Sequence, residues 1–185
     1  MERTCDIPTI GRDPDAFEAF YREHLPWVRR FVARRIDDSH SAADLTTDIF
    51  LAAINGAERY RPEHGAPRAW LAGVARNVVA DYFRRQLREA RANSRLVGRA
   101  LLDEHSADRI AARIDGERLA RQLYRSLAGL PENQRAVVEL VAVDGLTVAE
   151  AAQALGITTG NARVRYHRAR ARLQHVLPNP FEVIA

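Results

Sequence analysis

The sequence predicts an all-α protein in which two small helical domains are joined by a flexible linker, with a helix-turn-helix in the second domain. Apolar residues recur at helical spacing along most of the 185 residues, and no segment shows the strict alternation typical of a β-strand. Prolines and glycines stand where helices are expected to begin and end. Hydrophobic residues make up 46% of the chain, which is enough to form folded cores.

The helical pattern divides the chain into five segments. Periodicity is absent at the start of the chain, and it weakens again in the middle, where small, polar and charged residues are mixed. In chain order, we expect an N-terminal extension (1–13), a first helical domain (14–90), a linker (91–112), a second helical domain (113–178) and a tail (179–185).

Three helices are expected in the first domain. The first begins at Pro14, and Pro26 should bend or break it because proline removes a backbone hydrogen bond from a helix interior. The second helix covers about 42–54. The third covers about 68–88 and follows a loop that ends at Pro67, a residue suited to a first helical turn.

The second domain contains the helix-turn-helix. A helix over 132–143 precedes the segment Thr147-Val-Ala-Glu150, which has the pattern of a capping box: the threonine caps the backbone and the glutamate reaches back. Gly156 ends the short helix that follows, and Thr158 or Thr159 caps the last helix. Two helices joined by a glycine turn are typical of a DNA-binding motif.

The last helix carries five arginines, and no Asp or Glu occurs from Ala151 to Phe181. Solvated helix faces usually mix both signs of charge, so this pattern favours DNA binding. Helical periodicity directs Ala162, Tyr166, Ala169 and Leu173 toward the protein interior. It directs Gly160, Arg163, Val164, His167, Arg168 and Ala171 outward, with Arg165, Arg170 and Arg172 on the flanks. In a major groove, Arg163 and Arg168 would reach guanine edges, Val164 a thymine methyl group, and the flanking arginines phosphates.

Composition agrees with an intracellular nucleic-acid-binding protein. The formal net charge is +4, and all 28 basic residues are arginine, which the codon usage of a GC-rich genome explains. Cys5 is the only cysteine, so an intrachain disulfide and a cysteine-based zinc site are excluded. No apolar run is long enough to span a membrane and the N-terminus is too polar for a signal peptide, so we expect a cytoplasmic protein.

Enzyme activity is not indicated. No carboxylate pair or nucleophile–base pair stands out, and the six histidines are scattered without metal-ligand spacing. We therefore expect no catalytic residue, no metal and no cofactor.

Two features of the first domain are unusual for a simple DNA-binding regulator. Asp44 and Asp48 lie one turn apart on an otherwise apolar helix, which suits a protein partner; an ordinary solvated surface helix would show the same spacing. The third helix combines an aromatic residue with polar and basic ones, a combination that can hold unstacked single-stranded bases. A core tryptophan with arginines favoured by the helix dipole is the alternative. These residues are Trp70, Asn77, Arg84, Arg85 and Arg88.

Three segments together resemble the sigma factors of the extracytoplasmic-function (ECF) group of bacterial RNA polymerase. Asp44-Leu-Thr-Thr-Asp-Ile-Phe50 is similar to the group's D-L-x-Q-[ED]-x-F motif. Arg68-Ala-Trp-Leu-Ala-Gly-Val-Ala-Arg-Asn77, followed by Asp81-Tyr-Phe-Arg-Arg85, resembles its promoter-melting helix. Leu130-Pro-Glu-Asn-Gln-Arg135 and the helix-turn-helix resemble its C-terminal domain. The resemblance covers about 13–177, nearly the whole chain.

The resemblance implies a non-catalytic subunit that directs transcription initiation. The first domain would bind the coiled-coil of the polymerase β′ subunit, and the polymerase β flap would be a second contact. The first domain would also recognise and open the −10 element of the promoter, and the second would bind the −35 element as duplex. The protein would be a monomer before docking, and an anti-sigma factor is a possible further partner.

The resemblance also assigns residues to these surfaces. Core-polymerase binding falls to Asp44, Leu45, Asp48, Ile49 and Phe50. Binding of −10 DNA falls to Trp70, Asn77, Arg84, Arg85 and Arg88, with Asn77 lining a pocket for a flipped base and Trp70 supporting the loop. Binding of −35 DNA falls to Thr159, Asn161, Arg163, Val164, Arg165, His167, Arg168, Arg170 and Arg172.

The chain departs from the family pattern at two kinds of position. Thr47 stands where a glutamine is usual, and Val164 replaces a small polar residue on the face directed at the groove, so the −35 preference should differ from that of common relatives. Ala162 is smaller and Tyr166 larger than the usual residues, and we expect one to compensate for the other.

A helix-turn-helix regulator that binds duplex DNA without polymerase is the competing hypothesis. The first domain distinguishes the two, because such a regulator has no need for the 44–50 and 68–85 motifs together.

Overall fold

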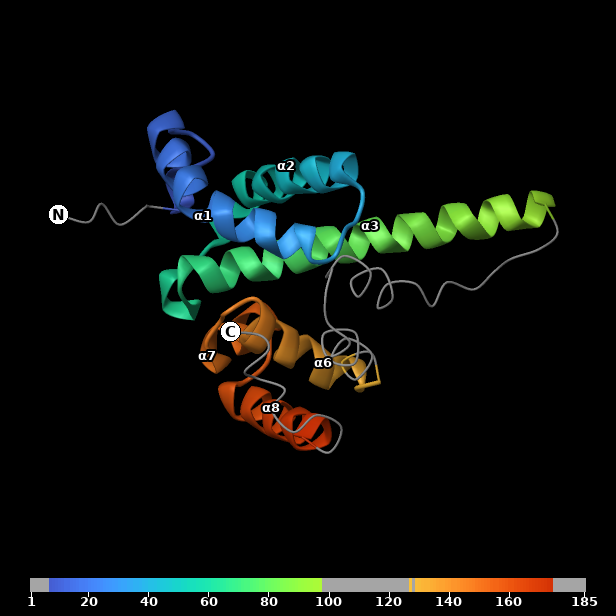
Figure 1. The fold of residues 1–185 in the computed structure, drawn as a ribbon. Helices are drawn as coiled ribbons and strands as arrows, with labels where there is room; N and C mark the ends of the chain where they lie inside the picture. The colour runs from blue at the N-terminus through green and yellow to red at the C-terminus, as the bar shows by residue number, and fades with distance from the viewer. Residues whose placement is uncertain (1–6, 98–126, 128, 175–185) are drawn as a thin grey trace.

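The computed structural model describes residues 7–97, 127 and 129–174 (Figure 1). The expected tail, most of the expected linker and the start of the expected second domain lie outside this part of the chain. The described residues contain helices and no strands, which confirms the all-α prediction.

The first domain consists of three long helices and three short 3-10 helices. A long central helix, α3, lies against α1 and α2, and it extends well past them in Figure 1. In chain order the elements are η1 (Ile7–Thr9), α1 (Pro14–Ala33), α2 (Ser39–Gly56), η2 (Ala57–Arg59), η3 (Pro62–His64) and α3 (Pro67–Val97).

Boundaries differ from the expected ones at three places. Helix α1 continues through Pro26, so the expected break is wrong. Helix α2 begins earlier than expected because the carboxylate of Asp38 caps it, accepting a hydrogen bond from the Ser41 amide at 2.7 Å. Helix α3 starts at Pro67 as predicted but runs to Val97, into the segment expected to be a linker.

The second domain contains α6 (Glu132–Val138), a π-helical turn η4 (Glu139–Val143), α7 (Val148–Ala154) and α8 (Thr159–Gln174). The capping box at Thr147 and Glu150 is present in full, as predicted. Thr158 caps α8, with its hydroxyl oxygen 3.2 Å from the Asn161 amide nitrogen. Gly156, between α7 and α8, has φ +64°, a conformation that glycine adopts without strain.

One hydrophobic core runs through both domains. Phe20, Phe31, Ile49 and Leu71 are fully buried in the first domain, and Leu140, Leu146 and Ala151 of the second domain belong to the same cluster. A smaller cluster fixes α8 on α6 through Val138, Ala169 and Leu173. The second domain is therefore packed against the first, with α7 lying beside α3 (Figure 1).

Candidate nucleic-acid and partner interfaces

The exposed face of α8 has the composition expected of a DNA-binding helix. Ala162, Ala169 and Leu173 are buried and Tyr166 is half-buried, which confirms the predicted inward face. Tyr166 packs against both clusters of the second domain, and one of these contains Ala162; this agrees with the expected compensation of size. The outward residues Gly160, Asn161, Arg163, Val164, His167, Arg168 and Ala171 are all exposed, as are the flanking Arg170 and Arg172.

The side chains on the flanks of α8 are less exposed, or more closely bound to the protein, than those at the centre of its outward face. Thr159 and Arg165 are only half-exposed. Arg172 donates a hydrogen bond to the side-chain oxygen of Gln134 on α6 at 3.0 Å. This bond ties one flank of α8 to its own domain, whereas Arg163 and Arg168 project from the centre of the exposed face.

The side chains of α2 divide into a buried and an exposed set. Asp44 and Asp48 are exposed, as expected for a docking surface. Leu45, Ile49 and Phe50 are 3%, 0% and 3% exposed, so the expectation that they also face a partner is wrong in this conformation. The three apolar residues lie on the opposite side of the helix, where helical periodicity turns them into the core.

Two exposed residues on or beside α2 were missed by sequence reasoning. Leu51 follows the quoted motif on α2 and is 51% exposed. Tyr21 on α1 is 36% exposed, and its ring centre lies 4.6 Å from that of Phe50. Leu51 could have been found from the sequence, because it is an apolar residue close to Asp44 and Asp48 in the chain. Nothing in the sequence indicated that Tyr21 packs against α2.

The polar and basic residues expected to bind −10 DNA lie on the surface of the third helix. Asn77, Arg84, Arg85 and Arg88 are exposed on α3, and Arg84 forms an ion pair with Asp81 one turn before it. The N-terminal part of α3 contacts α7 at Gly73, and the exposed polar residues follow this contact along the helix.

Trp70 is half-buried and has a supporting position. Its ring centre lies 5.5 Å from that of Tyr60 and 6.4 Å from that of Phe20. The hydroxyl of Tyr60 donates a hydrogen bond to the Gly65 carbonyl at 2.7 Å, so the aromatic pair underlies the loop that precedes α3. This arrangement agrees with the expectation that Trp70 supports the loop.

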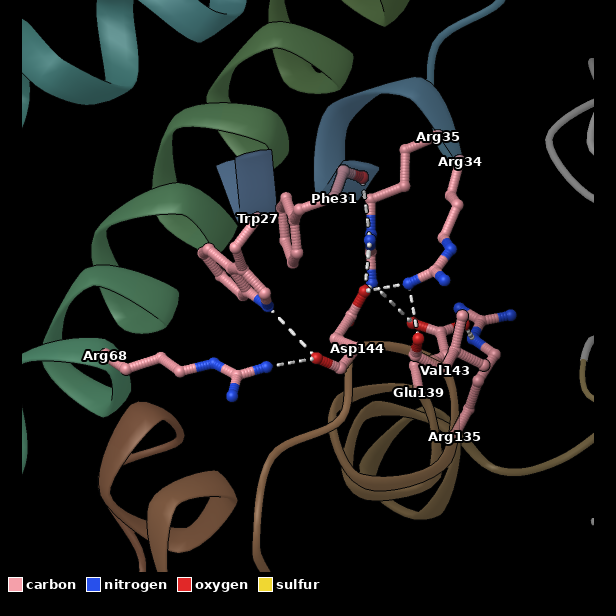
Figure 2. A network of polar contacts seen from close by, with 9 residues as sticks. All are labelled: Trp27, Phe31, Arg34, Arg35, Arg68, Arg135, Glu139, Val143 and Asp144. Atoms are coloured by element: carbon pink, nitrogen blue, oxygen red, sulfur yellow. Dashed lines mark hydrogen bonds and ion pairs between the residues drawn. The ribbon is translucent and has the colours of Figure 1, made fainter. Parts of the chain in front are cut away.

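Asp144, which sequence reasoning did not single out, lies at the centre of the contact between the domains (Figure 2). Its fully buried carboxylate accepts two hydrogen bonds from Arg35, at 3.1 Å to Oδ1 and 2.7 Å to Oδ2. Its backbone oxygen accepts two more at 3.0 Å, from the indole nitrogen of Trp27 and from Arg68. Arg34 lies 3.5 Å from the same carboxylate.

Further aromatic and charged groups surround the ion pair between Arg35 and Asp144. The guanidinium carbon of Arg35 lies 3.7 Å from the centre of the Phe31 ring, and Glu139 is 4.0 Å from its Nη2 atom (Figure 2). Burial raises the pKa of Glu139, although Arg35, Arg135 and Arg76 oppose this effect. Burial lowers the pKa of Arg76, and Glu139 opposes it. The domain contact therefore encloses charged side chains that would be hydrated if the domains were apart.

The described residues contain no group of three or more His, Cys, Asp and Glu side chains that could hold a metal ion. Among the helices in this part of the chain, none is long and apolar enough to cross a membrane.

Comparisons with known proteins agree with both domains. The family models Sigma-70 region 2 and Sigma-70, region 4 match residues 20–89 and 120–173. The ECF RNA polymerase sigma factor SigC of Mycobacterium tuberculosis is 37% identical over 164 residues, which cover 85% of this chain and 81% of SigC. The RNA polymerase sigma factor CarQ of Myxococcus xanthus is 32% identical over 165 residues, covering 88% of this chain and 90% of CarQ.

Two solved structures have a similar fold. CnrH, in complex with the cytosolic domain of CnrY, superimposes with a TM-score of 0.65 at 22% identity, covering 96% of this chain and 97% of CnrH. The sigma factor RpoE, in complex with the anti-sigma factor NepR from Bartonella quintana, superimposes with a TM-score of 0.60 at 25% identity. That match covers 88% of this chain and 96% of RpoE.

Proposed function

The chain belongs to the ECF group of RNA polymerase sigma factors, and on that basis we propose how its surfaces divide the steps of transcription initiation. As a member of this group it is a non-catalytic subunit that binds core RNA polymerase and recognises promoter DNA. We place its action in the cytoplasm, where the polymerase works.

The exposed face of α2 is the proposed docking surface for the coiled-coil of the polymerase β′ subunit. Asp44 and Asp48 supply negative charge, and Leu51 supplies apolar area beside them. Leu45 and Ile49 keep the helix in place from inside the core. A surface with an apolar centre and charged neighbours gives both affinity and orientation.

The loop before α3 and the exposed stripe of α3 are the proposed −10 surface. Arg84, Arg85 and Arg88 would neutralise phosphates of the separated strand, and Asn77 would line the pocket for a flipped base. Trp70 contributes indirectly, because it packs beneath the loop with Tyr60. Binding an unstacked base lowers the free energy cost of opening the duplex.

The exposed face of α8 is the proposed −35 surface. Arg163 and Arg168 would form hydrogen bonds with guanine edges and Val164 would contact a thymine methyl group. The flanking arginines would bind phosphates and set the orientation of the helix. The same domain would contact the polymerase β flap.

A protein inhibitor is the remaining proposed partner. The structures of CnrH and RpoE each contain a bound protein, and in the RpoE structure it is an anti-sigma factor. We extend this kind of partner to the present chain by family resemblance.

The observation that carries the proposal is that one chain exposes both an acidic face on α2 and an acid-free basic face on α8. Run-off transcription on fragmented genomic DNA, with core polymerase and with or without this protein, tests it. New RNA start sites that share two short elements at a fixed spacing are the expected result. Duplex binding without any new start site would instead favour the regulator that acts without polymerase.

A further inference from the structure

The loop before α3, residues 61–66, is closed by hydrogen bonds at Gly65. The Gly65 amide donates a hydrogen bond to the Pro62 carbonyl at 3.0 Å, which ends η3. The Gly65 carbonyl accepts a hydrogen bond at 2.7 Å from the hydroxyl of Tyr60, five positions earlier. Both backbone polar groups of Gly65 are therefore held, one by the loop itself and one by a side chain that precedes the loop.

The backbone of Gly65 has a conformation that residues with a side chain rarely adopt. Its φ is +140° and its ψ is 175°. Glycine can occupy many backbone conformations, so its own preferences do not select this one. The hydrogen bond from the Tyr60 hydroxyl to the Gly65 carbonyl supplies a contact that does.

Tyr60 is itself fixed in position before its hydroxyl reaches the loop. Its side chain is buried, and its ring centre lies 5.5 Å from that of Trp70, with an angle of 61° between the ring planes. Its amide donates a hydrogen bond to the carbonyl of the buried Ala57 at 3.0 Å. The ring and the backbone of Tyr60 are thus both anchored in the first domain.

The support beneath Tyr60 extends to the start of the described chain. Ile7 and Ile10 of η1 are buried in the same hydrophobic cluster as Tyr60. Helix η1 contacts η2, which ends directly before Tyr60. A Cβ atom at Gly11 would lie 3.4 Å from the carbonyl oxygen of Ile54, so this segment also lies against the end of α2. Residues 7–11 therefore help to fix η2 and, with it, Tyr60.

The Tyr60 hydroxyl is protonated at neutral pH and can act as the donor in this bond. Burial raises its pKa above the ordinary value of 10.0, and the carboxylate of Glu63 raises it further. An ionised oxygen could only accept hydrogen bonds and would repel the Gly65 carbonyl. The direction of the bond is therefore determined by the chemistry of the two groups.

We propose that Tyr60 is a positioning residue for the −10 element, whose hydroxyl holds the loop 61–66 in the shape that receives the flipped base before DNA binds. A loop with a fixed shape loses little conformational entropy on binding and does not rearrange around a base that fits poorly. The role in base selection rests on the function proposed above for this loop, whereas the ordering of the loop by Tyr60 does not.

The first test concerns the loop in the free, full-length protein. Tyr60→Phe removes the hydroxyl and keeps the ring that packs on Trp70. Tyr166→Phe makes the same change in the second domain and is the control. We expect amide hydrogen exchange in peptides spanning 61–66 to be ~2–10-fold faster in Tyr60→Phe and unchanged in Tyr166→Phe. Equal exchange in Tyr60→Phe and wild type would overturn the proposal.

The second test measures base selection by holoenzyme assembled from core polymerase and full-length protein. A fluorescent single-stranded oligonucleotide with the mapped −10 element is compared with oligonucleotides in which one base of the element is replaced. We expect Tyr60→Phe to bind the matched oligonucleotide ~2–10-fold more weakly than wild type, and the one replaced at the flipped base about equally well. The ratio of the two affinities should therefore fall in Tyr60→Phe and stay at the wild-type value in Tyr166→Phe.

A further variant changes the loop from the other side of the hydrogen bond. Gly65→Ala disfavours the backbone conformation at φ +140°, but its methyl group would also overlap the side-chain amide of Gln153 on α7. Gln153→Ala removes this overlap and serves both as the background and as the matched control. We expect the double variant to lose base selection as Tyr60→Phe does, and Gln153→Ala alone to keep it. Wild-type selection by the double variant would contradict a role for the shape of the loop.

The outcomes separate the proposal from the function on which it rests. If Tyr60→Phe weakens the matched and the replaced oligonucleotides equally, or leaves both unchanged, the hydroxyl has no part in base selection and the proposal is overturned. If the wild type does not distinguish the oligonucleotides, the function proposed for this loop is refuted. The exchange measurement would then still decide whether Tyr60 orders the loop.

Discussion

Neighbouring residues of α2 serve different purposes because a helix turns each side chain by a fixed angle. Leu45 and Ile49 are buried, and Asp44 and Asp48, each one position earlier, are exposed. The motif that resembles a docking sequence therefore combines core residues with surface residues. Among its members, only the exposed carboxylates can be changed without altering the core.

Asp48→Arg should abolish association with core polymerase and leave the fold intact. The change reverses one of the two negative charges of the proposed docking face, and the new positive charge would repel the positive groups on the partner that Asp48 is proposed to attract. Co-purification with core polymerase measures the effect, and circular dichroism checks the fold. Glu89→Arg, an equal charge change at an exposed position of α3, is the control and should bind normally. Retained association of Asp48→Arg would refute the docking assignment.

Arg168→Ala should weaken −35 recognition by ~1–3 kcal/mol if its guanidinium contacts a base edge. The residue is exposed at the centre of the basic face of α8. Binding to the mapped −35 duplex and to a scrambled duplex, each at several salt concentrations, separates the two kinds of contact. Arg172→Ala, on the flank, removes a proposed phosphate contact together with the hydrogen bond to Gln134, and should weaken both duplexes equally. An equal loss on both for Arg168→Ala would identify it as a phosphate contact instead.

At the scale of elements, capping residues set most helix boundaries. The boundaries with such a cap are the ones that could be predicted from the sequence. The capping box at Thr147 and Glu150, the glycine turn and the start of α3 at Pro67 were all predictable, because each depends on residues within one turn. Pro26 was misjudged because its cost is local and the burial of α1 compensates for it: Phe20, Val28 and Phe31 on both sides of it are fully buried.

Thr147→Ala should lower the free energy of unfolding by about 1 kcal/mol, within the usual range for loss of a helix cap. Helix α7 has only seven residues, so the capping box satisfies a large share of its unpaired amides. Urea denaturation measures the change. Thr47→Ala, an exposed threonine inside α2, should leave stability nearly unchanged because alanine favours a helix interior. Equal losses in both variants would argue against the capping role.

At the scale of the whole molecule, the sequence predicted two helical domains but not their contact. Arg35 and Asp144 are 109 positions apart, and helical periodicity carries information over only a few turns. Asp144 also stands where a helix was expected to end, and nothing within a few turns of it in the sequence indicates that Arg35 is its partner. The exposed faces of α2 and α8 were predictable in part from local pattern, whereas the contacts of Gly65 and Arg68 with the second domain depend on how the domains pack.

Ionisation of Glu139 offers a pH test of that packing. Burial raises its pKa above the ordinary value of 4.5, so the folded protein binds a proton here more readily than the unfolded chain. Its contribution to stability is therefore greatest at low pH and is lost as the pH rises through the folded-state pKa. Arg35, Arg76, Arg135 and Asp144 are the charged groups that influence it.

Glu139→Gln removes this ionisation and should make the protein more stable relative to wild type as the pH increases from about 4 to about 7. The effect should be modest, because one third of the Glu139 side chain is exposed and water screens its charge. Urea unfolding of both proteins across this pH range gives the difference in free energy. Glu132→Gln, at an exposed position on α6, should show no such trend. A difference between Glu139→Gln and wild type that stays constant with pH would show that Glu139 is hydrated in the folded protein, and would refute the inferred effect of burial on its pKa.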